Sequence, residues 1–493
     1  MKRIAIVGGG TSGLSAAFSL EKYRRTHPAE LEYVLYESEP RLGGVLRTEH
    51  ADGCQIEAGP DSFLTEKPWA SDLCRELGIG DQLIGSNDAE RKTYILVKGR
   101  LIAIPDGLMF MVPTKILPTV FSPLFSVGAK LNMAREWFHP PQKAQADESV
   151  SSFVQRHYGP EMVDRLADPL LSGVYGGEAA QLSVRAVLPR FAEMEAKYGS
   201  LGRAMLAAKR RMHSGTSKSA RPLFTSLKNG MQQMADSLVA QLTATSPLPA
   251  NKVSGLQFSG GHWRISSARG SSGFDALILA VPTHAAATLV QSSSEQLARE
   301  LAEIQYTSSI TINLGFDGQV RQALPRGFGF LIPRSENKRM LACTFVHTKF
   351  PHRAAPDRAL LRCFVAGAND EHVLQASDEG IVNVIRAELK DILGLAAEPL
   401  FTRVYRWTRA MAQYGVGHLE KLKRIDGLCS QLPGLFLAGN GYRGIGVPDC
   451  VLSGADAATN ALRYCGVPDV QADPRLSRTR LEYAQHVPDG RQT

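Results

Sequence analysis

Apolar runs, a helical apolar pattern and a glycine cluster follow one another at the start of the chain. Ile4-Ala5-Ile6-Val7 predicts a short strand, residues 14–20 carry a helical apolar pattern, and residues 31–36 predict a second strand. A strand, a glycine turn, a helix and another strand in this order form a βαβ unit. The pattern therefore predicts an α/β fold.

Three later segments carry signals of the same kind. Residues 251–258 and 262–266 alternate on either side of Gly260-Gly261, which predicts a hairpin. Residues 274–282 predict a buried strand that ends in proline. Residues 434–440 predict another strand, which leads through a glycine loop into a helix that opens near Val451.

Residues 107–131 are the nearest candidate for a membrane-spanning helix, but the chain has no clean apolar run of about eighteen residues. Pro113, Pro118 and Pro123 would repeatedly interrupt a helix there. Two interpretations stay open: a buried, kinked segment, or a patch that lies on a membrane face. The side chains that would form the apolar side of this patch are Met109, Phe110, Met111, Phe121 and Phe125.

Composition narrows the class of protein without choosing a function. The 493 residues should form about two to four domains. Hydrophobic residues are 44% and charged residues 21%, which excludes a disordered or fibrous chain. The charge of +8 suits acidic small molecules or anionic lipid, whereas no basic stripe points to nucleic acid. Seven widely spaced cysteines without a C-x-x-C argue against disulfides and zinc, and favour a reducing cytosol.

The first glycine cluster has the spacing G-x-G-x-x-G at Gly8, Gly10 and Gly13. The first glycine allows a tight turn, the second lets the backbone approach a pyrophosphate, and the third lets helix and strand pack closely. The helix N-terminus then offers free N–H groups to the phosphates. Glu37 ends the second strand, where its carboxylate can accept both ribose hydroxyls and would repel a 2′-phosphate.

Two further segments suggest which dinucleotide binds. Arg41-Leu42-Gly43-Gly44 supplies a second glycine doublet that can approach a diphosphate, with arginine charge beside it. Residues 57–60 read Glu-Ala-Gly-Pro. This combination is similar to the GG-doublet flavoproteins, which bind FAD and use an E-x-G-P segment next to the flavin.

More specific blocks follow. Residues 407–418 read W…AQYGVGH, residues 439–450 run from Gly-Asn to Asp-Cys, and residues 170–178 contain G-V-Y-G-G. With residues 8–13 and 41–44, these blocks resemble the oxygen-dependent porphyrinogen oxidases of haem synthesis, which are monoamine-oxidase-like flavoproteins. The resemblance covers the chain from about residue 2 to about residue 466.

The resemblance implies an FAD-binding site. No cysteine lies between Trp407 and Gly415, where amine-oxidising relatives attach the flavin, so FAD should be noncovalent. The residues expected to contact FAD are Gly8, Gly10, Thr11, Ser12, Gly13, Glu37, Ser38, Arg41, Gly43, Gly44, Val45, Ala58, Gly59, Pro60, Asp61, Val253, Trp407, Gly439, Asn440, Ile445, Gly446 and Val447. The residues expected to line an apolar substrate slot are Leu170, Leu171, Val174 and Tyr175. No catalytic base and no metal site is assigned.

The resemblance also implies the reaction. A porphyrinogen would lose six electrons through the flavin to O2, which leaves as hydrogen peroxide. We expect protoporphyrinogen IX as the substrate. Coproporphyrinogen III is the alternative, because Pro113-Thr114-Lys115 resembles the bacterial members of the family. Further alternatives are another flavin amine oxidase or desaturase, and a flavin-free binding protein of the GDI type.

The expected location and partners follow from the same resemblance. The protein should be cytoplasmic, with peripheral contact to the inner face of the cell membrane as an open alternative. Candidate partners are a ferrochelatase that receives the product and a second copy of the chain. A nucleic-acid partner is not expected.

We expect three interleaved parts and a tail. The fold class is α/β, with a Rossmann-like FAD-binding domain, a mixed-sheet α+β substrate domain, and a helical subdomain that could face a membrane. The expected ranges are 1–88, 222–285 and 419–466 for the FAD-binding domain, 89–114 and 286–418 for the substrate domain, 115–215 for the helical subdomain, and 467–493 for a polar, mobile tail.

Overall fold

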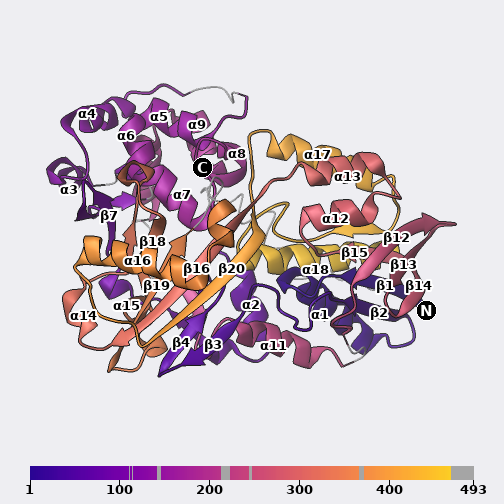
Figure 1. The fold of residues 1–493 in the computed structure, drawn as a ribbon. Coiled ribbons are helices and arrows are strands. Elements are labelled where there is room, and N and C mark those ends of the chain that lie inside the picture. The colour runs from indigo at the N-terminus through magenta and orange to yellow at the C-terminus, as the bar shows by residue number, and fades with distance from the viewer. Residues whose placement is uncertain are drawn as a thin grey trace.

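The computed structural model describes residues 1–109, 111–113, 115–141, 146–212, 222–243, 247–365 and 371–467. Figure 1 shows a layer of strands between helices on the right, a larger sheet on the left, and a group of helices above that sheet. The predicted tail, from residue 468 onward, lies outside the described residues, as does Phe110.

A four-stranded parallel sheet forms the right-hand layer. Its strand order is β2 (Leu31–Tyr36), β1 (Lys2–Val7), β15 (Ala276–Leu279) and β21 (Leu435–Leu437). In register, Ile4 lies opposite Tyr33 on one side and Ala276 on the other. The predicted strands are confirmed, and the two distant ones join the N-terminal sheet.

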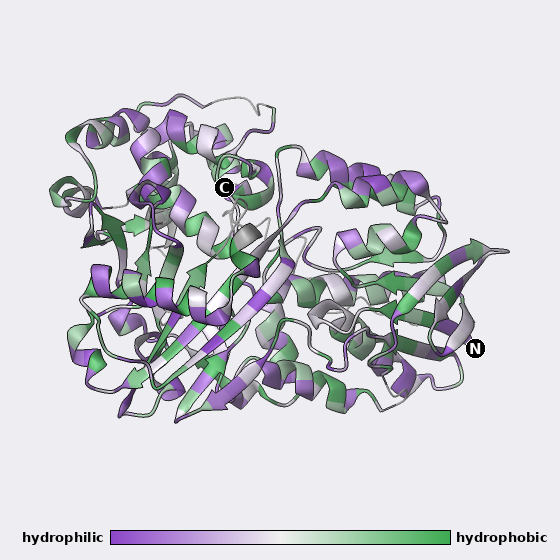
Figure 2. Cartoon of the chain, viewed as in Figure 1, coloured by the Kyte–Doolittle hydropathy of each residue, from purple (hydrophilic) through white to green (hydrophobic). Residues whose placement is uncertain are grey.

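Alternate residues of these strands face two different cores, as a parallel sheet covered on both faces requires. Ile4, Ile6 and Ile278 pack in one core with α1 (Thr11–Thr26), α2 (Trp69–Glu76), α11 (Gln232–Gln241) and α18 (Val447–Tyr464). Val7 and Leu279 pack in the other core with α12 (Thr283–Val290), α13 (Glu295–Ala302) and α17 (His418–Cys429). Figure 2 shows these strands mostly in the hydrophobic colour.

Smaller strand groups border this layer. The predicted hairpin is confirmed as β12 (Val253–Ser259) and β13 (His262–Ser267), and β14 (Gly270–Phe274) extends it. β3 (Thr48–Ala51) pairs with β4 (Cys54–Glu57), and β11 (Phe224–Leu227) lies between β5 (Phe63–Leu64) and β6 (Leu83–Gly85).

The left-hand layer is a seven-stranded, mostly antiparallel sheet. Its order is β20 (Phe401–Ala412), β16 (Tyr306–Asp317), β19 (Arg358–Val365), β18 (Met340–Phe345), β17 (Gly329–Leu331), β7 (Thr93–Val97) and β8 (Arg100–Ala103). Ile310, Ile312 and Leu314 face α16 (Asp378–Leu393), which covers one side of the sheet. Thr311 and Asn313, which alternate with them, therefore point to the opposite face.

Within the described residues, the helical part contains eight α-helices. They are α3 (Ile116–Phe121), α4 (Val127–Glu136), α5 (Val150–Tyr158), α6 (Pro160–Met162), α7 (Asp168–Tyr175), α8 (Val184–Val187), α9 (Pro189–Tyr198) and α10 (Leu201–Met212). Short strands β9 (Leu108–Met109) and β10 (Val112–Pro113) precede them. Among the described residues, no helix is long and apolar enough to cross a membrane.

The structure corrects part of the predicted apolar patch. Met111 and Phe125 are buried in the core of the helical part, so they cannot belong to an outer patch. Phe121, by contrast, is 81% exposed. The side chains of Met109 and Phe110 lie outside the described residues. A proline-broken segment has no single period, which is why its inner and outer side chains could not be separated by sequence pattern.

One domain boundary also differs from the expected ranges. Helix α13 and most of α12 fall within residues 286–418, the range expected for the substrate domain. They pack instead on the parallel sheet, where Ala286, Val290, Leu297 and Leu301 share a core with its strands. The strand that opens the seven-stranded sheet in this range is β16, which begins at Tyr306.

Candidate functional site

The glycine clusters meet at one edge of the parallel sheet, because the carboxyl ends of parallel strands lie together. Gly8 has a φ of +109°, and a Cβ there would lie 2.5 Å from the carbonyl oxygen of Ala280. A Cβ on Gly13 would lie 1.7 Å from the carbonyl oxygen of Gly8. A Cβ on Gly10 would meet nothing within 4 Å. Two glycines are therefore needed by the fold, whereas the third borders open space.

The glycine doublet faces this loop. A Cβ on Gly44 would lie 3.1 Å from the Cα of Gly10, and the N–H of Gly43 donates to the carbonyl oxygen of Gly9 at 2.8 Å. The guanidinium of Arg41 donates to three backbone carbonyls of its own loop. Arg41 therefore holds the shape of the doublet, in addition to any charge that it offers a phosphate.

Glu37, which follows β2, lies next to the first glycine loop. Its carboxylate accepts from the N–H of Gly9 at 2.6 Å and from the hydroxyl of Ser38 at 3.1 Å. Asn251 donates its backbone N–H to the carbonyl oxygen of Glu37 at 2.7 Å, and Val253 begins β12 close by in sequence. The Asn251 side chain is fully buried, yet neither its nitrogen nor its oxygen has a partner. Such orphaned atoms are rare in native proteins and suit a bound polar group.

Helix α1 begins beside the open space next to Gly10. Gly10 caps this helix without a side-chain hydrogen bond, so the first N–H groups, at Thr11 and Ser12, are not capped by a side chain at that position. Helix α18 packs so closely on α1 that a Cβ on Gly454 would lie 2.0 Å from the carbonyl oxygen of Ser12.

Helix α18 presents a second N-terminus, at Gly446 and Val447. Asp449 accepts from the N–H of Gly446 at 3.1 Å, and Lys67 donates to both carboxylate oxygens of Asp449 at 2.7 Å. Sequence reasoning did not assign Lys67, because it lies far from Asp449 in the chain.

The E-x-G-P segment is held from both layers. The indole N–H of Trp407 donates to the carbonyl oxygen of Ala58 at 2.9 Å, and the guanidinium of Arg362 donates to the carbonyl oxygen of Gly59. A Cβ on Gly59 would lie 2.0 Å from the carbonyl oxygen of Val45. The structure thus brings together four of the residues expected to contact FAD, which are Val45, Ala58, Gly59 and Trp407.

The loop at residues 439–446 is fixed by two tyrosines. The hydroxyl of Tyr414 donates to the carbonyl oxygen of Asn440 at 2.7 Å and accepts from the N–H of Gly444 at 2.7 Å. The hydroxyl of Tyr306 donates to the Asn440 side chain at 3.3 Å. His418 stacks on Tyr414 at 4.2 Å, and burial lowers its pKa, so it serves as a packed structural residue. Ile445 is half-buried and packs against the core that α12, α13 and α17 share with the parallel sheet.

The four expected slot residues do not share one surface. Leu171 lies in the helical core, Leu170 is half-buried beside it, and Val174 is 56% exposed. Tyr175 packs edge-on against Tyr414, with ring centroids 6.1 Å apart, and burial raises its pKa. Of the four, Tyr175 is therefore the one that the structure brings to the glycine loop.

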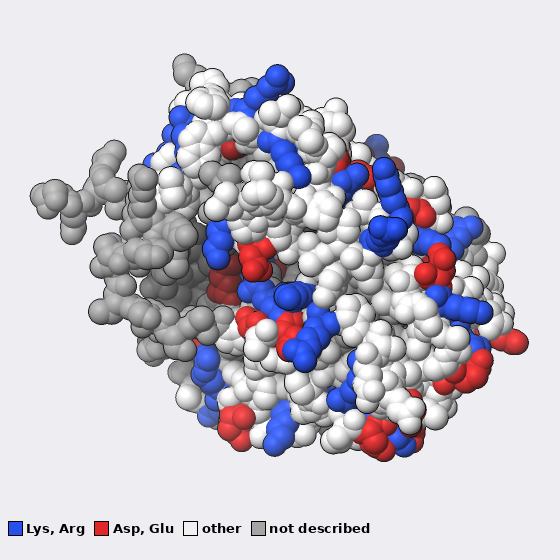
Figure 3. Space-filling model, turned by 90° about the vertical axis from the view of Figure 1, so that its left-hand side faces the viewer, with Lys and Arg blue, Asp and Glu red and all other residues white. Residues whose placement is uncertain are grey.

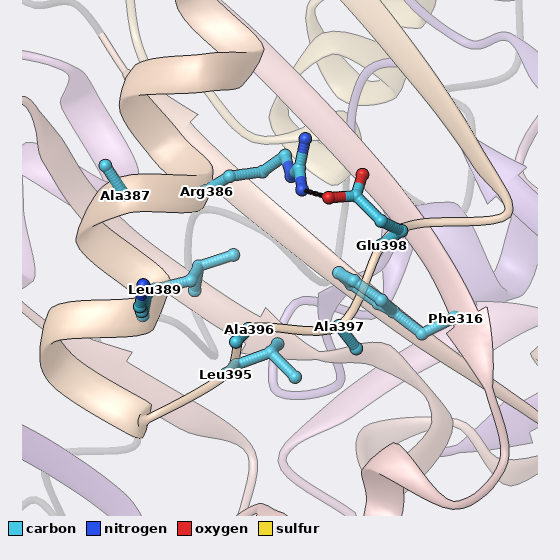
Figure 4. Close-up of a pocket in the computed structure, with 9 residues that line it drawn as sticks. Phe316, Arg386, Ala387, Leu389, Leu395, Ala396, Ala397 and Glu398 are labelled. Atoms are coloured by element: carbon cyan, nitrogen blue, oxygen red, sulfur yellow. Dashed lines mark hydrogen bonds and ion pairs between the residues drawn. The ribbon is translucent and has the colours of Figure 1, made fainter.

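A separate hollow lies away from the glycine-lined site. It lies between the end of α16 and the start of β20, is lined by Phe316, Leu389 and Leu395, and is bordered by the Arg386–Glu398 ion pair (Figure 4). None of its lining residues belongs to a glycine cluster.

Comparison with known proteins identifies the family. The model of the flavin containing amine oxidoreductases matches residues 11–462. The chain belongs to this family. Within the family, it is 36% identical to a coproporphyrinogen III oxidase of Bacillus subtilis (strain 168) over 467 residues, covering 94% of this chain and 98% of the relative. It is also 29% identical to protoporphyrinogen oxidase 2 of Arabidopsis thaliana, with 94% of both chains covered.

Solved structures agree with the fold. A protein from Exiguobacterium sp. 255-15, named as a candidate protoporphyrinogen oxidase, has 30% identity and a TM-score of 0.83 over 93% of this chain and 98% of that one. A putrescine oxidase variant, at 18% identity and a TM-score of 0.65, shares the fold. The predicted family, its α/β fold and its cofactor, FAD, are confirmed.

Features of this flavoprotein's own structure fit FAD. The space beside Gly10, the two helix N-termini and the close glycine backbones suit a diphosphate. The unpartnered side chain of Asn251 beside Glu37 suits the polar end of a nucleoside. Among the described residues, no group of three or more His, Cys, Asp or Glu side chains could hold a metal ion.

Proposed function

We propose that the protein oxidises a porphyrinogen to the porphyrin in haem biosynthesis, with coproporphyrinogen III as its preferred substrate. In the net reaction, six hydrogen atoms leave the macrocycle and three O2 molecules become three hydrogen peroxide molecules. When bound, FAD supplies the two-electron acceptor that O2 regenerates. The observation that carries the proposal is the glycine-lined seat between the two sheets, in a chain that matches porphyrinogen oxidases over nearly its whole length.

The chain's own residues would hold FAD at the positions described above. We assign the diphosphate to the N–H groups at the start of α1 and to the glycine doublet, and the adenosine to Glu37 and Asn251. The flavin ring would lie against the E-x-G-P segment, Trp407 and the start of α18. FAD should be noncovalent, because no cysteine lies between Trp407 and Gly415.

The substrate would lie on the face of the seven-stranded sheet that α16 does not cover. Leu331 reaches to 3.9 Å from the position of a Cβ on Gly173, so the G-V-Y segment borders that face. Arg409 is an exposed cation two residues beyond Trp407, and its φ is +47° where β20 shifts register against β16. Such backbone strain in a residue other than glycine is concentrated at functional sites. We assign Arg409 to a carboxylate arm of the substrate.

Two observations favour coproporphyrinogen III over protoporphyrinogen IX, which the sequence alone had favoured. The coproporphyrinogen III oxidase of Bacillus subtilis is 36% identical to this chain, against 29% for the Arabidopsis protoporphyrinogen oxidase 2. The net charge of +8 also suits the substrate with more carboxylate arms.

The test is turnover of both porphyrinogens by the purified, FAD-loaded protein, followed by porphyrin fluorescence and by peroxide release. We expect coproporphyrinogen III to give the higher kcat/KM. A higher kcat/KM for protoporphyrinogen IX would reverse the substrate assignment. Turnover of an amine but of neither porphyrinogen would refute the proposed function.

We further propose peripheral contact with an anionic membrane through an apolar patch on α3, α4 and the turn after α4. The residues of this patch are Leu117, Val120, Phe121, Val127, Leu131, Trp137 and Phe138, all of them exposed. Apolar patches of this kind, rimmed by polar residues, mark interaction sites.

Charge indicates which surface would meet the patch. Residues 107–141 contain Lys115, Lys130 and Arg135, and their single acidic residue is Glu136. Glu136 is 2% exposed, because its carboxylate turns inward to the hydroxyl of Ser200. The outer surface of this segment is therefore apolar and cationic, which suits anionic lipid. Lys and Arg side chains also gather on the upper part of the face shown in Figure 3.

Sedimentation with vesicles tests this second proposal. We expect the protein to pellet with anionic vesicles and to be released by salt, and Phe121→Asp to weaken binding several-fold. Val384→Asp is the matched control, since Val384 is an exposed apolar residue of α16. Equal binding by both variants would refute the patch. Product transfer to ferrochelatase and formation of a homodimer stay predictions of the resemblance.

A further inference from the structure

Five charged side chains are buried together behind the E-x-G-P segment. This buried ionic cluster consists of Glu57, Asp61, Lys349, Arg353 and Arg362. Their side chains are between 0% and 15% exposed. Charged side chains are rarely buried to this degree unless they are paired, and burying an ion costs several kcal/mol even after relaxation.

The five groups interact with one another. Lys349 donates to the two carboxylate oxygens of Asp61 at 3.2 and 3.0 Å, and Arg362 lies 3.8 Å from the same carboxylate. Arg353 lies 3.4 Å from the carboxylate of Glu57. Burial would raise the pKa of Asp61, but Lys349, Arg362 and Arg353 outweigh it and hold this pKa below its ordinary value. Asp61 is therefore ionised at neutral pH.

The charges do not cancel. Counted in their ordinary ionised forms, three cations stand against two carboxylates, which leaves an excess of one positive charge. Burial lowers the pKa of Lys349 and of Arg362, and the neighbouring Asp61 carboxylate opposes that change. Burial raises the pKa of Glu57. Protonation of Glu57 would remove one negative charge and would therefore enlarge the positive excess. His352, which follows Lys349 closely in the chain, has a pKa lowered to about 4 by burial and by Arg353, so it is neutral and adds nothing.

The cluster is joined to the backbone of the segment that would border the flavin. Arg362 donates to the carbonyl oxygen of Gly59, and Arg353 donates to the carbonyl oxygen of Asp61 at 2.8 Å. The Nε atoms of both arginines, and one terminal nitrogen of Arg353, are buried without a hydrogen-bond partner, although that terminal nitrogen lies 4.0 Å from the carboxylate of Asp61. The cluster therefore has cationic donors that the two carboxylates do not satisfy.

We propose that the excess positive charge of this cluster makes the bound flavin easier to reduce, because FAD gains negative charge when it accepts a hydride. In a poorly screened interior, one charge influences a neighbouring group over a longer range than in water. The five residues are thus positioning and electrostatic residues that act on FAD through the segment at residues 58–61. The proposal rests on the placement of FAD that we propose above.

Charge substitutions of opposite sign test this inference on the FAD-loaded protein. Asp61→Asn raises the charge of the cluster by one unit, and Lys349→Met lowers it by one unit. The measurement is the two-electron reduction potential, determined by equilibration with a reference dye and without any porphyrinogen. We expect shifts in opposite directions, upward for D61N and downward for K349M, of roughly tenfold in the reduction equilibrium, or about 30 mV each.

Two further variants complete the design. Glu57→Gln adds one unit of positive charge with little change in shape, and should shift the potential in the same direction as D61N if that variant does not fold. Arg358→Met is the matched control: it removes a cation from the same strand as Arg362, but at a partly exposed position beside Asp52, and should leave the potential unchanged.

The outcomes separate this inference from the proposed function. Unchanged potentials, or shifts of the same sign for D61N and K349M, would overturn the electrostatic role. The potential does not depend on the substrate, so a protein that fails to oxidise either porphyrinogen can still bear out the electrostatic role. If the flavin binds elsewhere in the protein, D61N and K349M will leave the reduction potential unchanged, as R358M does. This result also overturns the inference.

Discussion

The open space beside Gly10 and the tight contact beside Gly13 predict opposite outcomes for two substitutions that each add one methyl group. A Cβ on Gly13 would lie 1.7 Å from the carbonyl oxygen of Gly8, about half the distance of an ordinary van der Waals contact. The backbone of β1 or α1 would have to move. Overpacking of this kind costs about 1–3 kcal/mol or more, so Gly13→Ala should destabilise the protein whether or not FAD is bound.

Gly10→Ala should leave the FAD-free protein almost unchanged. Nothing lies within 4 Å of the added methyl group, and the φ of −76° and ψ of −173° at Gly10 suit alanine. Replacing glycine by alanine at a helix cap costs about 0.5–1 kcal/mol. If the space beside Gly10 holds the diphosphate, however, the methyl group occupies that space, and FAD affinity should fall by about 100-fold or more, roughly 2.7 kcal/mol.

Thermal unfolding with and without added FAD, together with FAD binding measured by flavin fluorescence, separates the two effects. We expect Gly13→Ala to melt several degrees lower in both conditions. We expect Gly10→Ala to melt like the native protein without FAD, but to lose the stabilisation that FAD gives the native protein. Native FAD affinity in Gly10→Ala would refute the assignment of this space to the cofactor.

Three further predictions concern single side chains. Arg409→Ala should raise KM for coproporphyrinogen III about tenfold with little change in kcat, and an unchanged KM would exclude a carboxylate contact. His157 has a raised pKa, since hydrogen bonds to Glu136 and Glu195 outweigh its burial, so its stabilisation is present below about pH 6.5 and is lost as pH rises through the raised value. The difference in melting temperature between the native protein and His157→Gln should accordingly be larger at about pH 6 than at about pH 9. Cys343 and Cys363 are fully buried, and burial raises the pKa of Cys343, so neither should react with a thiol reagent until the protein unfolds.

Local sequence was sufficient where short-range sterics dictate structure. The tight turn at Gly8, the helix that follows it and the acidic residue at the end of β2 are each specified within a few residues, and they could be read before the fold was known. Packing decided the rest. Helices α12 and α13 carry ordinary amphipathic patterns, and nothing in those patterns states which of two sheets they cover.

The buried ionic cluster lay beyond sequence reasoning for a different reason. Composition rules place Lys, Arg, Asp and Glu at the surface, so Lys349, Arg353 and Arg362 read as solvent-exposed residues. Their partners, Glu57 and Asp61, are some 300 residues away in the chain, and the E-x-G-P resemblance links them to the flavin rather than to these cations. Once the strands pair, the alternation of β19 places Arg362 on the face opposite α16, and it then meets Asp61.

Hydrogen bonds between segments far apart in the chain fix the two layers relative to each other beside the glycine-lined site. The two layers are joined beside the glycine-lined site by directional polar bonds: Trp407 to Ala58 and Arg362 to Gly59. Hydrogen bonds fix distance and angle more narrowly than apolar contacts do. A small shift of the seven-stranded sheet against the parallel sheet would therefore break these bonds before it disturbed either hydrophobic core. In the placement that we propose, the position of the substrate face relative to the flavin is set by the segment at residues 58–61, which accepts these bonds and borders the buried ionic cluster.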